Sequence, residues 1–124
     1  MFNNNALRSS FKQFRIAKNI QKKLSVLFQK DLRNLVTNNL MSVTEVKVSN
    51  DIKCITVYFS FLFDVKANEA FTILENNKTL IKKKLYQSIK NDYQTMPELV
   101  FKMDSAQANA SRLEQLYNKI ENGV

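Results

Sequence analysis

The sequence predicts an α+β fold in which helices cover one face of a three-stranded sheet. Long segments carry apolar residues at helical spacing, and three short segments alternate apolar with polar side chains as strands do. A chain of 124 residues fits one domain, so we expect a single unit over residues 1–124. Such a chain buries roughly two thirds of the surface that its unfolded form exposes, which is enough for a substantial core.

A long first helix is predicted over residues 5–34, because its apolar side chains recur every three or four residues. Those side chains are Ile16, Ile20, Leu24, Leu27 and Phe28. Basic residues follow the same spacing, displaced around the helix: they are Arg8, Lys12, Arg15, Lys18 and Lys22. An ordinary solvated face usually mixes charges of both signs, whereas here no acidic residue precedes Asp31. This segregation favours a phosphate-facing surface over a merely solvated one.

Two strands are predicted after a polar connection over residues 34–39. Residues 43–48 form the first strand, and a turn follows at Ser49, Asn50 and Asp51, because Asn and Asp side chains bond to nearby backbone. The second strand alternates strictly, with its apolar set at Ile55, Val57, Phe59, Phe61 and Phe63. One face of it must be core, and the short connection predicts an antiparallel hairpin.

Helical spacing returns over residues 67–93, and the polar run 76–79 inside it predicts a kink or two abutting helices. Pro97 is expected to end this helical region, because it lacks a backbone donor and restricts the residue before it. A third strand follows, in which Leu99, Phe101 and Met103 form one face.

Asp104 and Ser105 can then cap a C-terminal helix over residues 106–120. The predicted order is helix, strand, strand, helix, kink, helix, strand, with the C-terminal helix added. This is the order of KH-like domains of type II, a fold that binds single-stranded RNA.

Several kinds of chemistry are excluded by composition. The chain has no His, one Cys, one Pro and one Gly, and the glycine is the penultimate residue, Gly123. A catalytic triad has no histidine base, a zinc cluster lacks ligands, and phosphate-binding loops lack their glycines. Carboxylates such as Asp51 and Glu98 lie at element boundaries, where capping explains them. We therefore expect no enzyme activity, no metal and no cofactor.

The segments of the chain indicate a cytoplasmic protein. Cys54 has no partner for an internal disulfide, which is compatible with a reducing compartment, and we expect it to be packed rather than reactive. The N-terminus lacks the charged and apolar regions of a signal peptide. The longest apolar run, residues 55–63, is too short to span a bilayer, so we expect no stable membrane association.

The net charge of +8, with a pI near 9.7, favours anionic partners. Nucleic acid is the first choice and an anionic membrane the second. Charge alone supports equally well the alternative that the lysines only keep the protein in solution.

Four short segments, in shared order and spacing, carry a resemblance to a known family. They are residues 15–17 with 20–22 in the first helix, 46–51 at the hairpin, 57–60 in the second strand, and 97–105 from Pro97 to Ser105. Over about residues 15–120 the chain resembles the ribosome-binding factor A family. The resemblance implies a monomeric, non-catalytic KH-like domain that binds the immature small ribosomal subunit and its precursor rRNA, and promotes late maturation and processing. A general KH-like RNA-binding module outside the ribosome, or a basic-helix adaptor for a protein or membrane surface, are the alternatives.

The predicted RNA-binding residues combine the first helix with the region of the kink. They are Arg8, Lys12, Arg15, Lys18, Lys22, Asn76, Asn77, Lys78, Lys82, Lys83 and Lys90. The family usually has Ala-x-Gly at the kink, where this chain has Asn77, Lys78 and Thr79. Because Asn tolerates left-handed geometry, the kink is expected at Asn76 or Asn77. Lysine is a point charge, so these contacts should hold phosphate more than they distinguish bases.

Overall fold

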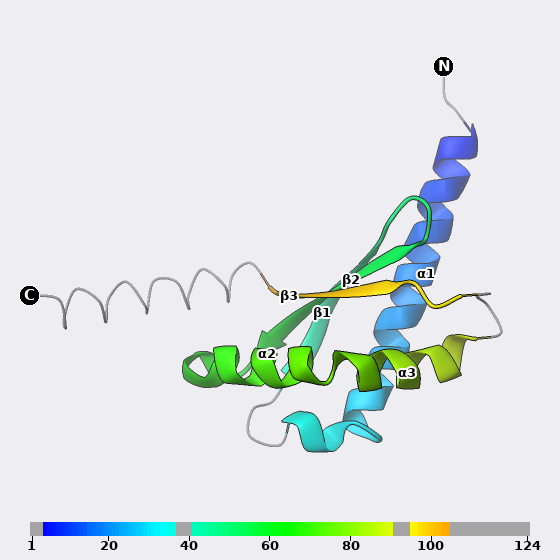
Figure 1. Ribbon diagram of the computed structural model, residues 1–124. Coiled ribbons are helices and arrows are strands. Elements are labelled where there is room, and N and C mark those ends of the chain that lie inside the picture. The colour runs from blue at the N-terminus through cyan, green and yellow to red at the C-terminus, as the bar shows by residue number, and fades with distance from the viewer. Residues whose placement is uncertain (1–3, 37–40, 91–94, 105–124) are drawn as a thin grey trace, which may run out of the picture.

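The computed structural model describes residues 4–36, 41–90 and 95–104. The elements in chain order are α1 (Asn4–Gln29), the 3₁₀ turn η1 (Arg33–Val36), β1 (Met41–Val48), β2 (Cys54–Phe61), the 3₁₀ turn η2 (Asp64–Lys66), α2 (Ala67–Asn76), α3 (Lys78–Ile89) and β3 (Glu98–Met103). The predicted α+β order is confirmed (Figure 1). Ser105 and the predicted helix over residues 106–120 lie outside the described residues.

The sheet has the order β1-β2-β3, so β2 is the central strand. β1 and β2 form the expected antiparallel hairpin, in which Met41 pairs with Phe61 and Val48 with Ile55. β3 lies parallel to β2. A parallel pair needs a long crossover connection, and α2 and α3 lie within that connection (Figure 1).

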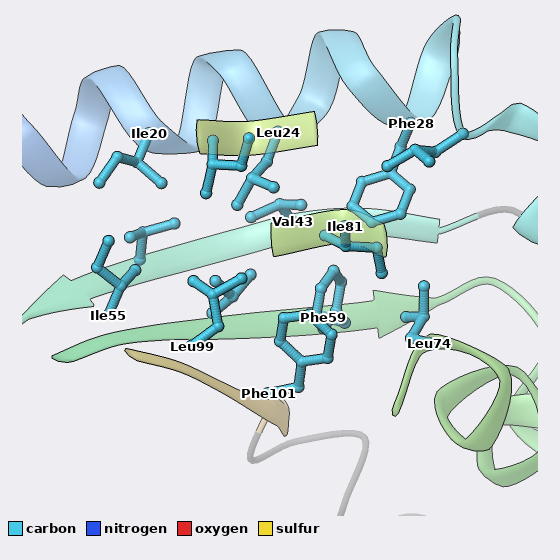
Figure 2. Packing of buried hydrophobic residues seen from close by; sticks show 14 of the residues in the cluster. Ile20, Leu24, Phe28, Val43, Ile55, Phe59, Leu74, Ile81, Leu99 and Phe101 are labelled. Carbon is cyan, nitrogen blue, oxygen red and sulfur yellow. The ribbon is translucent and has the colours of Figure 1, made fainter. Parts of the chain in front are cut away.

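One face of the sheet carries the core. Along β2 the side chains alternate, with Ile55, Val57, Phe59 and Phe61 between 0% and 3% exposed and the residues between them half-buried. Both α1 and α3 contribute buried side chains to the same cluster, as Figure 2 shows for Ile20, Leu24, Phe28 and Ile81. The predicted placement of the helices on one face is therefore confirmed.

Three aromatic rings join elements that are distant in the sequence. Phe59 of β2 makes edge-to-face contacts with Phe28 of α1, at a centroid distance of 5.9 Å, and with Phe101 of β3, at 5.1 Å. Such pairs contribute about 0.5–1.5 kcal/mol each beyond the burial of their area. Phe59 is completely buried between them (Figure 2).

Two predicted ends were wrong, one at the end of α1 and one at the end of β2. α1 ends at Gln29 and not at residue 34: the N–H of Leu32 donates to the carbonyl of Leu27 at 2.8 Å, and Leu32 turns into the core. β2 ends at Phe61, because its partner there is Met41, the first residue of β1. Phe63, which was expected on the core face, is 54% exposed.

The predicted interruption between α2 and α3 is confirmed at Asn77, with φ −108° and ψ 15°. This geometry is not left-handed, so the tolerance of Asn for that region is not what the kink uses. Instead, the backbone N–H and the Nδ2 of Asn77 donate to the carbonyl of Ile73, at 3.1 and 2.8 Å. α3 ends at Ile89, well before Pro97, so this proline is not its terminator.

The carboxylate of Asp51 organises the hairpin turn. The hydroxyl of Ser49 donates to Asp51 Oδ1 at 2.7 Å, and the backbone N–H of Lys53 donates to the same oxygen at 3.1 Å. The hydroxyl bond, and then the backbone bond, favour the charged form and lower the pKa of Asp51 below its ordinary 3.8. The turn also holds Ile52 at a positive φ of 57°, which is rare for a β-branched residue.

The pKa of Asp51 should therefore rise towards 3.8 when Ser49 is replaced by Ala, because the hydrogen bond from the Ser49 hydroxyl is removed. With the folded-state pKa lowered, this carboxylate stabilises the fold above pH 3.8, and that contribution disappears as the pH falls through the folded-state value. An NMR titration of the Asp51 carboxyl carbon measures the shift. Ser42→Ala, at an exposed serine of β1, is the control; an unchanged Asp51 pKa in Ser49→Ala would contradict the assignment.

Replacing Phe59 by Leu should lower the free energy of unfolding by about 1–3 kcal/mol, since the apolar character stays but both ring–ring interactions are removed. Phe63→Leu should change it by less than about 0.5 kcal/mol, because that side chain is exposed. Urea unfolding of both variants checks this. Equal losses of stability would mean that the rings of Phe28 and Phe101 add nothing beyond apolar area.

Candidate nucleic-acid interface

A basic row lies along the outer face of α1. Burial of Ile20 and Leu24 fixes the rotation of the helix and directs Lys12, Arg15, Lys18 and Lys22 to the exposed side. These are four of the five residues predicted on this helix. The fifth, Arg8, belongs to α1, but its side chain lies outside the described part of the structure.

Two exposed phenylalanines lie among these charges, and sequence reasoning missed them. Phe11 is 67% exposed and Phe14 is 60% exposed. The ammonium of Lys18 lies 5.4 Å from the centroid of the Phe14 ring, within cation–π range. Their spacing was the available signal: Phe11 precedes Arg15 by four residues and Phe14 precedes Lys18 by four, so each pair shares a helix face.

The lysines of the second basic group, on α3, differ in whether they contact other parts of the protein. Lys83 and Lys90 are exposed. Lys82 is half-buried and its ammonium lies 3.7 Å from the carboxylate of Glu98 on β3. Of this group, Lys83 and Lys90 are therefore the residues most open to a ligand.

Lys78 has two contacts within the fold. Its ammonium lies 3.2 Å from the carboxylate of Glu75 and 5.0 Å from the centroid of the Phe101 ring. Lys78 thus connects the start of α3 to the end of α2 and to β3. At the same kink Asn76 is exposed, whereas Asn77 is half-buried and uses its amide to close α2.

A contact between helices brings the two basic groups towards each other. Lys23 Nζ donates to the carbonyl of Ser88 in the last turn of α3 at 2.6 Å. Lys22 is the neighbour of Lys23, and Lys90 follows Ser88 by two residues. Figure 1 shows the C-terminal end of α3 beside α1.

Two tyrosines and the single cysteine lie outside the two basic groups. Tyr58, on β2, is half-buried, and Lys47 Nζ lies 5.4 Å from its ring centroid. Cys54 is a half-buried free thiol at the start of β2. Tyr86, on α3, packs against the core cluster.

The described residues form no group of three or more side chains that could hold a metal ion. Among these same residues, no helix combines the length and the apolar character needed to cross a membrane.

The comparison with protein families decides the relationship. A family model described as ribosome-binding factor A matches residues 12–117. The chain belongs to the ribosome-binding factor A family. Its membership confirms the resemblance found in the four sequence segments.

Members of the ribosome-binding factor A family from several bacteria are similar to the chain over most of its length. The protein from Flavobacterium johnsoniae is 32% identical over 115 residues, covering 86% of this chain and 88% of the relative. The one from Chlorobium phaeobacteroides is 33% identical over 103 residues, covering 82% and 87%. The one from Chlorobaculum parvum is 30% identical over 115 residues, covering 92% and 94%.

A solved structure of the same family shares the fold. The crystal structure of ribosome-binding factor A from Thermus thermophilus matches with a TM-score of 0.62 at 16% sequence identity. The match covers 73% of this chain and 94% of the Thermus chain. The KH-like α+β architecture predicted from the order of elements is thereby confirmed.

Lys78→Ala should lower the free energy of unfolding by about 1 kcal/mol, because alanine cannot reach the Glu75 carboxylate or the Phe101 ring. Alanine is a strong helix former, so helix propensity does not account for a loss of stability. Lys83→Ala, at an exposed position of the same helix, should change the value by less than about 0.5 kcal/mol. Urea unfolding compares the two; equal stability would show that the contacts of Lys78 contribute nothing.

Proposed function

We propose that this protein is a non-catalytic assembly factor that binds the immature small ribosomal subunit and its precursor rRNA. In this role it promotes late maturation and processing of the subunit. Support comes from its membership of the ribosome-binding factor A family, since the relatives carry ribosome binding in their name. The protein acts in the cytoplasm as a monomeric single domain over residues 1–124, with neither metal nor cofactor and without stable membrane association.

The observation that carries the proposal is the uncompensated positive charge of α1. Residues 4–29 include no Asp or Glu, and the basic row is exposed along the helix. When such a row binds RNA, its cations release the counterions that are condensed on the phosphates, which makes the free energy of association favourable and dependent on salt. Ammonium groups that lie outside internal ion pairs are the ones available for this contact.

The α3 group has a secondary role in the proposal. Lys83 and Lys90 can add phosphate contacts, whereas Lys78 and Lys82 already face carboxylates of the protein. A ligand that reached Lys78 would have to compete with Glu75. We therefore assign the larger share of RNA affinity to Lys12, Arg15, Lys18 and Lys22.

Charge reversal on α1 should weaken binding to immature small subunits strongly. The variant combines Arg15→Glu with Lys22→Glu, both exposed, and removes two phosphate-binding cations while adding two repulsive charges. The slope of log affinity against log salt should become shallower by about 0.7–0.9 for each phosphate that is no longer neutralised. Co-sedimentation of the folded variant with immature subunits, over a series of salt concentrations, measures both quantities.

The matched control makes the same change in net charge elsewhere. It combines Lys47→Glu on β1 with Lys66→Glu on η2, two exposed lysines outside the helix row. This control should bind almost as well as the unmodified protein. Equal binding by both double variants would remove α1 from the interface. Association of the unmodified protein with RNA in general, or with membranes, in place of small subunits would favour the corresponding alternative function.

A further inference from the structure

The outer face of α1 combines two kinds of group that are usually separated on a protein surface. Three members of the basic row follow Phe11 at intervals of four, three and four residues, so all four side chains lie along one line of the helix surface: Phe11, Arg15, Lys18 and Lys22. At a rise of about 1.5 Å per residue, the line from Phe11 to Lys22 is roughly 16 Å long. Phe14 lies beside it, with the Lys18 ammonium near its ring. Positive charge and exposed aromatic area therefore occupy the same strip.

The rings of Phe11 and Phe14 are not part of the hydrophobic core. The apolar face of α1 is occupied elsewhere, since Ile20 and Leu24 are completely buried and Phe28 is 5% exposed. Phe11 lies on the side of the helix away from that cluster, and Phe14 lies between that side and the buried stripe, where its side chain is still 60% exposed. They are among the most exposed large apolar side chains of the described residues.

The helix that presents the rings is held in place near them. Gln13 Nε2 donates to Asn50 Oδ1 in the β1–β2 turn at 2.8 Å, which connects this part of α1 to the hairpin. Further along, Gln21 Nε2 donates to the carbonyl of Val43 at 3.0 Å. The rings thus project from a supported helix, which reduces the entropy lost when a ligand binds.

We propose that Phe11 and Phe14 stack on unpaired bases, so that α1 binds single-stranded RNA in preference to duplex RNA. The proposal rests on the proposed function and specifies its ligand. Neighbouring cations hold the phosphates, and each ring accepts the face of a base, a contact that every base can make. Bases inside a duplex are already stacked on one another and offer no such face. A phosphate-only contact through lysines would not make this distinction.

An anionic membrane is a weaker match for the same strip. Helices that lie in a membrane interface bury a continuous apolar face, and the corresponding face of α1 is already used in the core. Two rings interleaved with Arg15, Lys18 and Lys22 offer little apolar area to insert. They do provide the alternation of charge and aromatic surface that a sugar-phosphate backbone with exposed bases requires.

The test compares full-length variants for binding to a short single-stranded adenosine RNA and to an adenosine–uridine duplex of the same length. Replacing both Phe11 and Phe14 by Leu should lower affinity for the single strand by about tenfold or more, with less than about a twofold change for the duplex. Replacing both by Tyr should preserve binding, because the rings remain. Phe63→Leu, at a 54% exposed ring beside Asp64, is the control and should have no effect.

Salt dependence separates stacking from charge. The Leu variant should retain the slope of log affinity against log salt, because it keeps every cation that binds phosphate, whereas Arg15→Glu with Lys22→Glu should make it shallower. Unchanged single-strand affinity in the Leu variant would overturn the proposal, as would an equal loss of affinity for the duplex. Binding of the unmodified protein to phosphatidylserine vesicles, with no binding to the single strand, would also overturn it.

The proposed function fails by a different result. If the unmodified protein does not co-sediment with immature small subunits, the ribosomal role is wrong, whatever the outcome with short RNA. If it co-sediments and the Leu variant binds adenosine RNA equally well, only the stacking proposal is wrong. Thermal unfolding of each variant verifies that the exposed substitutions leave the fold intact.

Discussion

The position of Phe59 is the constraint on which the rest of the molecule depends. Its ring meets Phe28 of α1 on one side and Phe101 of β3 on the other, so one side chain determines how a helix and two strands are arranged. Close packing makes this arrangement specific, because a buried ring has little freedom to rotate without opening a void. The rotation of α1 about its own axis follows from the contacts made by Ile20, Leu24 and Phe28.

Fixing the inner face of α1 also fixes its outer face. The basic row and the two exposed rings occur on one strip because the helix has a single rotation that buries its apolar side chains. Core packing and the candidate interface are therefore two consequences of the same helical repeat. The packing of α3 has a different result. Its rotation brings Lys78 and Lys82 close to carboxylates of the protein itself, so these two lysines form ion pairs within the fold.

Local patterns were sufficient to predict most of the fold. The alternation of Ile55, Val57 and Phe59 predicts β2, and the polar run at Asn77 predicts the break between α2 and α3. Features set by contacts distant in the sequence were beyond such patterns. The end of β2 depends on where β1 begins, which leaves Phe63 outside the core although it continues the alternation.

The candidate site shows the same division. Helical spacing was enough to place Lys12, Arg15, Lys18 and Lys22 on one face, because their exposure depends only on the helix that carries them. The cation–π contact of Lys78 needs Phe101, which is 23 residues further along the chain, and no local sequence pattern predicts that pair. The spacing of Phe11 and Phe14 relative to Arg15 and Lys18 also places them among the basic residues. The sequence alone did not predict their exposure, because aromatic residues on a helix are more often buried in the core.

The parallel pairing of β3 with β2 has a consequence for the synthesis of the chain. β2 is complete at Phe61, yet the strand that covers its second edge begins only at Glu98, after α2 and α3. While the intervening residues are being made, the most apolar strand of the protein has an unpaired edge, and such edges promote association between chains. A nascent chain is protected from this hazard only once residues 98–103 have left the translating ribosome, so the order of elements makes the last described strand the one that closes the sheet.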